Sequence, residues 1–234
     1  MDKIYGRKAV LETIDAGLTI HKAYIVRQKS HLIDKIIDKL NGAKVDIKFV
    51  DKDFFDKVDI NHQGVMIEVD SFKYKGLNDI GDAKRIILLD QIEDPHNLGA
   101  IIRSAESFGF DAVIIPERRS AKVTPTVYKT SAGAINNIDL VMVKNLNRTI
   151  EAVKKDGFWV YGLAGEADSS LSDTDLTGKV ALVVGNEGDG ISRLSREKCD
   201  MLVKIPMTGR VNSLNASVAS AISMYEVLRQ NGFN

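Results

Sequence analysis

Residues 85–103 read RIILLDQIEDPHNLGAIIR, and this stretch decides the fold. Its first five residues form an apolar run with the length and β-branched content typical of a buried strand. Turn-forming residues follow, and a helix is expected over Leu98–Phe108, where apolar residues recur at helical spacing and Gly109 ends the pattern. A strand that leads directly into a helix is the repeating unit of a parallel α/β sheet.

The same alternation continues toward the end of the sequence. Helical patterns separate the apolar runs, and a last helix is expected over Asn215–Gln230. The expected strands are Ala112–Ile115, Leu140–Val143, Trp159–Leu163, Val180–Val184 and Leu202–Ile205. Because the runs are apolar throughout, they predict a parallel sheet with helices on its faces.

The first 70 residues predict a second, smaller α/β unit. Helices are expected at Lys8–Ala16, His31–Leu40 and, as a short element, Asp53–Val58; strands are expected at Lys22–Val26, Val45–Val50 and Gly64–Val69. Residues 71–82 carry turn formers and charges without periodicity. We therefore predict a domain at 1–70, a linker at 71–82 and a domain at 83–234.

Composition limits the classes of partner. The formal net charge is +0 and the pI is about 6.9, so the basic excess of many nucleic-acid binders is missing and any RNA affinity must be local. The best local candidate is the loop with Arg118, Arg119 and Lys122, for which a plain solvated surface is the competing interpretation.

One cysteine, Cys199, excludes an intramolecular disulfide and a cysteine-based metal cluster, which fits a reducing cytoplasm. We interpret it as a small apolar side chain instead of a reactive thiol. The N-terminal residues lack an apolar leader segment, and no run approaches the length that spans a bilayer. A cytoplasmic protein, neither exported nor inserted, is expected.

Three groups of residues are candidates for a functional site, and the first lies at the start of the helix after residue 94. Asn97 follows the strand at the edge where parallel sheets gather ligands, although Asn also caps helices. Arg103 interrupts a helix that is otherwise small and apolar. His96 has no second ligand at metal-binding spacing, and no metal is predicted.

The second group is VGNEGDGI at residues 184–191, a glycine-rich turn after an apolar strand. The glycine order differs from the dinucleotide-binding fingerprint, and Glu187 would meet pyrophosphate with like charge. A nicotinamide-dependent oxidoreductase is thus disfavoured, while a plain turn stays open. The third, IPMTGRVNSLNASVA at residues 205–219, would be an ordinary capped helix if only Ser213 or Asn215 mattered.

Together these segments resemble the SpoU branch of the SPOUT methyltransferases, of the TrmH and RlmB type, over roughly residues 84–230. The matching residues are Asn97-x-Gly99-x3-Arg103, then Gly185-x-Glu187-Gly188-x-Gly190, then Ile205-Pro206-Met207 followed by Ser213-Leu214-Asn215-x-Ser217. In the first 70 residues, Tyr5-Gly6-Arg7-x2-Val10 and Gln63-Gly64-Val65 look like the L30e-like RNA-binding domain of RlmB-type members.

The resemblance implies a C-terminal trefoil knot, a homodimer, and S-adenosylmethionine as the cofactor, with no metal and no membrane. It implies that Leu163, Gly165, Gly185, Asn186, Ile205 and Leu214 hold the cofactor, that Arg103 is central to catalysis, and that Asn97, Glu187, Ser213 and Asn215 shape the site. Arg7 joins Arg118, Arg119 and Lys122 as an expected RNA contact. Arg103 would act either as a base assisted by the substrate phosphate or as a charged stabiliser of the developing alkoxide.

The implied reaction is methylation of a ribose 2′-hydroxyl in structured RNA, most specifically a guanosine of 23S ribosomal RNA. A tRNA substrate and a resistance methyltransferase with another ribosomal target are alternatives within the class. A non-catalytic RNA-binding or ribosome-assembly protein is the rival from a different class, and the intact motif residues argue against it.

Overall fold

The computed structural model describes residues 1–28, 30–56, 61–209 and 213–232. The chain forms two compact units, one of residues 1–73 with 123–129 and the other of residues 74–122 with 130–234. The larger unit includes Lys75, whose backbone N–H donates to the Leu140 carbonyl at 3.0 Å. Lys75 therefore pairs with the larger unit's sheet, although it lies inside the segment that we predicted as a linker.

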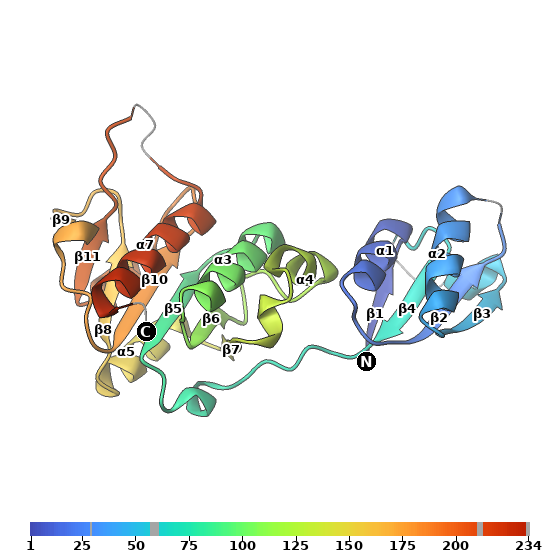
Figure 1. The fold of residues 1–234 in the computed structure, drawn as a ribbon, viewed down its shortest axis with the longest axis horizontal. Helices are drawn as coiled ribbons and strands as arrows, with labels where there is room; N and C mark the ends of the chain where they lie inside the picture. Colours follow the sequence, from blue (N-terminus) through green and yellow to red (C-terminus); the bar gives the residue numbers. More distant parts are fainter. Residues whose placement is uncertain (29, 57–60, 210–212, 233–234) are drawn as a thin grey trace. The chain divides into compact units, whose positions relative to one another are not determined.

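The larger unit is built on a sheet whose described strands all pair in parallel, which confirms the predicted sheet (Figure 1). In spatial order the strands are β7 (Asp139–Val143), β6 (Ala112–Pro116), β5 (Arg85–Asp90), β10 (Val180–Gly185), β8 (Trp159–Leu163), β11 (Met201–Lys204) and β9 (Ser169–Ser170). Sequence patterns predicted all of these except β9, which has two residues and no apolar run. The apolar strands β5 and β10 lie next to and at the centre, and β6 pairs with β5; the side chains of all three strands are largely buried.

Helices α3 (Pro95–Ser107) and α7 (Ala216–Asn231) pack side by side, as Figure 1 shows. Helix α5 (Leu146–Lys155) contributes Leu146, Ile150 and Val153 to a core cluster with strand residues such as Ile86 and Val183. The larger unit also has helix α6 (Arg193–Lys198) and the 3-10 turns η2 (Leu77–Ile80), η3 (Ala134–Asn136) and η4 (Leu171–Asp173). Most of helix α4 (Pro125–Ser131) belongs to residues 123–129, which group with the smaller unit.

The start of α3 differs from the prediction by three residues, for a local reason. Asp94 is the N-cap, because its side chain accepts a hydrogen bond from the His96 N–H at 2.9 Å, and Pro95 occupies the first turn. Asn97 therefore lies inside the helix with 8% of its surface exposed, and the interpretation of Asn97 as the cap is wrong. Its amide is free to serve the site.

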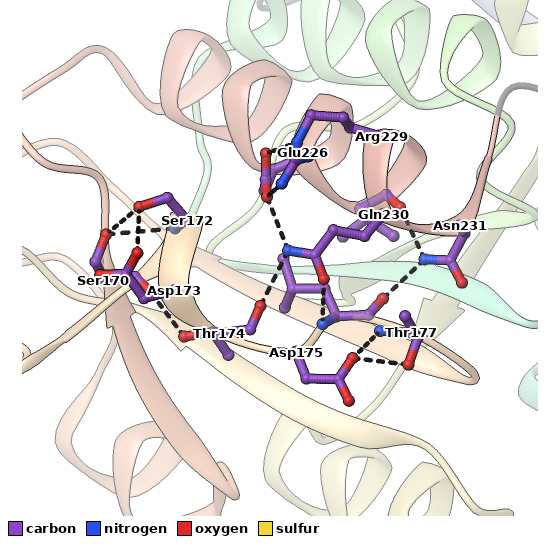
Figure 2. Close-up of polar contacts among 12 residues, drawn as sticks. Ser170, Ser172, Asp173, Thr174, Asp175, Thr177, Glu226, Arg229, Gln230 and Asn231 are labelled. Carbon is purple, nitrogen blue, oxygen red and sulfur yellow. Dashed lines mark hydrogen bonds and ion pairs between the residues drawn. The ribbon is translucent and has the colours of Figure 1, made fainter.

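The end of α7 is fixed by side chains that bond to a neighbouring backbone segment (Figure 2). Gln230 donates to the Thr174 carbonyl at 3.0 Å and accepts from the Leu176 N–H at 2.8 Å. Asn231 donates to the Leu176 carbonyl at 2.8 Å. These bonds satisfy backbone groups of residues 174–176 that no strand partner reaches, and they hold the last helix in place.

The smaller unit has a four-stranded sheet of β1 (Asp2–Tyr5), β4 (Val65–Val69), β2 (Ile20–Val26) and β3 (Asp46–Val50), in that order. Strand β4 is antiparallel to β1 and β2, whereas β2 and β3 are parallel. Helices α1 (Arg7–Asp15) and α2 (His31–Gly42) pack on one face through residues such as Val10 and Ile36. Strand β1 was not predicted, because its short sequence is half polar and only pairing with distant β4 defines it.

The expected short helix at Asp53–Val58 is a 3-10 turn, η1 (Lys52–Phe55), and residues 57 and 58 lie outside the described residues. Within the described ranges no helix is long and apolar enough to cross a bilayer. Among those same residues, no three His, Cys, Asp or Glu side chains are grouped so as to hold a metal ion.

Candidate functional site

The site lies at the carboxyl ends of the central strands. Gly185 at the end of β10 is in register with Asp90 at the end of β5, so the chain segments that follow these strands start side by side. One segment leads to α3 and carries Asn97; the other is the glycine-rich turn with Glu187. This edge is where open parallel sheets place ligands.

Side chains from all three sequence motifs meet there. Asn97 Nδ2 donates to Glu187 Oε1 at 2.6 Å, and Asn215 Nδ2 donates to the same oxygen at 2.9 Å. Asn215 Nδ2 also lies 3.0 Å from Asn97 Oδ1. Asn97 lies 90 positions before Glu187 and 118 positions before Asn215, yet the three side chains form one network. A single carboxylate oxygen joins α3, the turn and the start of α7.

Asn215 has a second function in this network. Its Oδ1 accepts hydrogen bonds from the N–H groups of Ser217 at 2.9 Å and Val218 at 3.4 Å, so it is the N-cap of α7. The capping interpretation of Asn215 is therefore correct but incomplete, because its amide nitrogen bonds to the other two motifs.

A pocket of about 460 Å³ opens beside this network, within the size range of small-molecule sites. All six residues predicted to hold the cofactor line it, and so do Glu187 and Ser213: the six are Leu163, Gly165, Gly185, Asn186, Ile205 and Leu214. The structure brings these residues together, and their function as a cofactor site stays a prediction.

Glycine is required at position 185 by a close approach within the turn. A Cβ atom there would lie 1.9 Å from the backbone carbonyl carbon and oxygen of Gly190. Asn186 closes the turn, because its Oδ1 accepts from the N–H groups of Gly188 at 2.9 Å and Asp189 at 2.8 Å. Gly185 therefore shapes the pocket wall by letting the turn fold back on itself.

Sequence analysis missed an ion pair at the pocket. Arg196 on α6 pairs with Glu166, which follows β8, and its Nε donates to the Ile191 carbonyl at 2.9 Å. Both charged residues line the pocket. We define this arrangement of Arg196, Glu166 and Ile191 as the Arg196 clamp. A single sequence does not reveal this ion pair, because Glu166 and Arg196 are 30 residues apart.

Arg103 is exposed on α3, and no hydrogen bond or ion pair of the described residues involves it. It does not line the pocket. The structure therefore leaves its guanidinium available to an incoming group, while Asn97, Glu187 and Asn215 are already bonded to one another.

The predicted RNA contacts fall into two groups. Arg118 and Arg119 are exposed, whereas Lys122 donates to the Glu117 carbonyl at 2.7 Å and its pKa is lowered by burial. Arg7, in the smaller unit, donates from Nε to the Gln63 carbonyl and from a terminal nitrogen to Ser30 Oγ, both at 3.1 Å. Lys122 and Arg7 thus have structural hydrogen bonds that the sequence did not reveal.

A parallel sheet with an apolar pocket and a shared polar network at its carboxyl edge defines an α/β enzyme with a small-molecule site. The family model described as the SpoU rRNA Methylase family matches residues 84–225, and the model described as RNA 2'-O ribose methyltransferase substrate binding matches residues 3–75. The chain belongs to the SpoU/TrmH family of RNA 2′-O-methyltransferases.

Individual relatives agree with this family. The chain is 44% identical to the 23S rRNA (guanosine-2'-O-)-methyltransferase RlmB of Xanthomonas campestris, over 97% of this chain and 96% of the relative. It is 40% identical to an uncharacterized tRNA/rRNA methyltransferase of Synechocystis, over 100% of this chain but only 64% of that longer protein.

The fold is shared with solved structures. The SpoU methyltransferase AviRb of Streptomyces viridochromogenes, in complex with AdoMet, has a TM-score of 0.67 and 24% identity, over 97% of this chain and 89% of that one. The predicted cofactor, S-adenosylmethionine, is confirmed for the family. The oxidoreductase alternative is wrong.

Proposed function

We propose that this protein transfers a methyl group from S-adenosylmethionine to the ribose 2′-hydroxyl of a guanosine in 23S ribosomal RNA. The observation that carries the proposal is the network of Asn97, Glu187 and Asn215 beside a pocket lined by every residue expected to hold the cofactor. The specific substrate is supported by the name of the Xanthomonas relative, which covers nearly all of both chains.

The pocket suits S-adenosylmethionine by shape and charge. Apolar side chains such as Leu163, Val203 and Met207 line it together with backbone groups of the glycine turn, which fits an adenosine held largely by main-chain bonds. Its charged side chains are three carboxylates and two cations, Glu166, Glu187, Asp189, Arg196 and Lys204. This slight acidic excess complements the sulfonium and ammonium groups of the cofactor.

The bound cofactor would supply an electrophilic methyl group, and the protein must align the 2′-hydroxyl with it and help remove the proton. In this proposal the network of Asn97, Glu187 and Asn215 keeps the three motif segments in register, Ser213 shapes the substrate side, and Arg103 meets the RNA. An exposed, unbonded guanidinium can grip a phosphate through two parallel hydrogen bonds and stabilise the developing alkoxide.

We also propose the family's other features for this chain. These are a trefoil knot in the C-terminal domain predicted at 83–234, an L30e-like RNA-recognition domain at 1–70, a cytoplasmic location and a homodimer. The predicted linker at 71–82 connects the two domains, and its residues from Lys75 onward pack with the larger unit. The homodimer is supported by Val218, Ile222 and Tyr225, which recur at helical spacing on α7 and are 40–47% exposed. Large apolar side chains gathered on one helix face favour contact with another protein surface.

A tRNA substrate is the second candidate, because the Synechocystis relative is named as a tRNA/rRNA methyltransferase. Transfer of radiolabelled methyl from S-adenosylmethionine to unmodified 23S rRNA and, in parallel, to bulk tRNA separates the two. Label recovered as 2′-O-methylguanosine from 23S rRNA supports the proposal. Label in tRNA alone identifies tRNA as the substrate. Label in neither RNA, with cofactor binding intact, contradicts both proposed substrates and points to another RNA or a required partner.

The same assay tests Arg103. Because this side chain is exposed and makes no hydrogen bond or ion pair with the described residues, Arg103→Ala should leave the melting temperature unchanged and reduce methyl transfer by roughly 10²- to 10⁴-fold. Arg103→Lys keeps the charge but cannot grip a phosphate with two parallel bonds, so it should restore little activity. Near-normal turnover in Arg103→Ala would remove Arg103 from the mechanism.

A further inference from the structure

The smaller unit displays aromatic side chains on the sheet face opposite its helices. Along β2 the side chains alternate: Ala23 and Ile25 join the core beneath α1 and α2, whereas Tyr24 and Val26 join a separate cluster on the other face. Phe55 and Met66 are buried in that second cluster. We call this surface, defined by Tyr24, Phe54, Phe55 and His62, the aromatic face.

Four rings are in continuous contact on the aromatic face, as two stacked pairs joined edge-on. Phe54 lies against Tyr24 with ring centroids 5.1 Å apart and an interplanar angle of 15°, and Phe55 meets Phe54 edge-on at 5.1 Å. Phe55 is stacked in turn on His62 at 4.4 Å and 10°. Phe55 is 1% exposed and Phe54 is 43% exposed, so the turn η1 buries one phenylalanine and presents its neighbour to solvent.

The charges around the stack are mixed. Lys22 lies 5.9 Å from the centre of the Tyr24 ring but is paired with Asp46 at 3.1 Å, and Lys48 is exposed in register with Tyr24. The face therefore lacks the dense positive charge of a phosphate groove. A flat, supported and exposed ring is suited to the π-face of a nucleobase, which needs no charge.

The stack is continuous with a segment already proposed to contact RNA. His62 Nδ1 accepts a hydrogen bond from the Gly64 N–H at 3.0 Å, and the residue between them, Gln63, accepts bonds from the backbone and side chain of Arg7. Residues 3–75 as a whole match the substrate-binding family model. These observations commit the occupant of the face to RNA.

A protein partner is a poorer fit for this surface. Among the described residues of the smaller unit, the exposed large apolar side chains are Met1, Leu32, Phe49 and Phe54, and only Phe54 belongs to the aromatic face. A protein interface normally centres on several neighbouring apolar residues. A single displayed ring matches the size of one base.

We propose that Phe54, supported from beneath by Tyr24, stacks on an unpaired base of the RNA substrate. The inference rests on the proposed function, because it takes RNA as the substrate of this enzyme. Stacking would increase RNA affinity with little dependence on base identity, since every base has a π-face. The larger unit would then determine which ribose is methylated.

The test compares Phe54→Ala with Phe49→Ala in the full-length protein. Phe49 is a matched control: it is 44% exposed, lies in the same unit, and is in register with Ile25, whose side chain belongs to the helix-side core. The dissociation constant for unmodified 23S rRNA transcript is measured without cofactor, and KM for RNA and kcat are measured with it.

Phe54→Ala should weaken RNA binding and raise KM for RNA by roughly 10-fold, the loss expected for one base stacked on an aromatic ring, with kcat and cofactor affinity unchanged. Phe49→Ala should behave as the wild type. Phe54→Leu, which keeps apolar bulk without a π-face, should resemble Phe54→Ala, and Phe54→Tyr should restore binding. These two variants separate stacking from a loss of folding.

Equal RNA affinity in wild type and Phe54→Leu, or equal losses in Phe54→Ala and Phe49→Ala, would overturn the inference. The affinity readout is independent of catalysis. If the Phe54 variants lose RNA binding while the wild type methylates no RNA, the stacking site stands and the proposed reaction fails.

Discussion

At the scale of single residues, Glu187 is the carboxylate that joins the three sequence motifs of the site. One of its oxygens accepts hydrogen bonds from Asn97 and Asn215, and the backbone N–H of Ala216 approaches the same atom at 3.4 Å. Hydrogen bonds to a charged acceptor are stronger than those between neutral groups, and an amide at this position would offer one good acceptor and an unwanted donor.

Glu187→Gln is therefore expected to reduce kcat by roughly 10- to 100-fold, in line with about 1.5–3 kcal/mol for a hydrogen bond to a charged group. Single-turnover methyl transfer at saturating RNA and cofactor gives the value. Glu197→Gln is the control, because Glu197 is an exposed carboxylate on α6 whose described partner is Arg193. Unchanged turnover in Glu187→Gln would show that the network does not serve catalysis.

Cys199 illustrates how surroundings decide the chemistry of a side chain. Its Sγ donates to the Ser195 carbonyl at 3.2 Å, and it packs against the core of the larger unit. Burial, assisted by the negative charge of Asp200, raises the pKa of the thiol from 9.0 to about 12. The pKa supports the interpretation of Cys199 as an inert side chain.

Alkylation of the folded protein should accordingly be slow at pH 8 and accelerate only as the pH approaches 12. In urea the same thiol should react as an ordinary cysteine. The pKa is raised in the folded state, so its contribution to stability is full below pH 9 and declines between pH 9 and 12. Rapid labelling of the native protein at pH 8 would contradict the burial argument.

At the scale of elements, the pocket wall depends on helix α6 as much as on the strands. The Arg196 clamp connects the segment after β8 with the end of the glycine turn, and Asp90 at the end of β5 accepts the Ser192 N–H at 2.9 Å. Two loops that follow different strands are thus held at a fixed separation. Both loops line the pocket, so their separation contributes to its width.

We expect Arg196→Ala to raise the dissociation constant for S-adenosylmethionine several-fold while kcat at saturating cofactor stays close to wild type. The partly exposed ion pair limits the effect. Isothermal titration measures the affinity. Arg193→Ala is the matched control, since Arg193 lies on the same helix in an exposed pair with Glu197 and does not line the pocket. Equal affinities of both variants for S-adenosylmethionine would show that the Arg196 clamp does not contribute to cofactor binding.

At the scale of the whole molecule, the exposed apolar side chains of α7 predict an oligomer. Val218, Ile222 and Tyr225 are exposed on the same helix whose first residue, Ala216, bonds to Glu187 of the polar network. Ile222→Glu should shift the mass measured by light scattering from dimer to monomer, because a charge would be buried at the contact. A wild-type protein that is monomeric at micromolar concentration would contradict the homodimer.

The sequence by itself determined the parallel sheet and the boundaries of most strands to within one or two residues. The pocket-lining residues Leu163, Gly185 and Leu214 came from the resemblance of its motifs to the SpoU methyltransferases. Local information was enough for the strands, because apolar runs mark their positions. It was also enough for the motifs, because residues at a short fixed spacing fall in the same turn of the chain. The start of α3 was missed by three residues, because Asp94 was overlooked as its cap.

Only the tertiary structure decided which side chains share a partner. Asn97, Glu187 and Asn215 meet because three strands end at one edge of the sheet, and the Arg196 clamp and the Tyr24–Phe54 stack likewise join residues far apart in sequence. Such contacts have no period or spacing in a single sequence. They arise from the order in which strands pair, and that order is set by the packing of the whole chain.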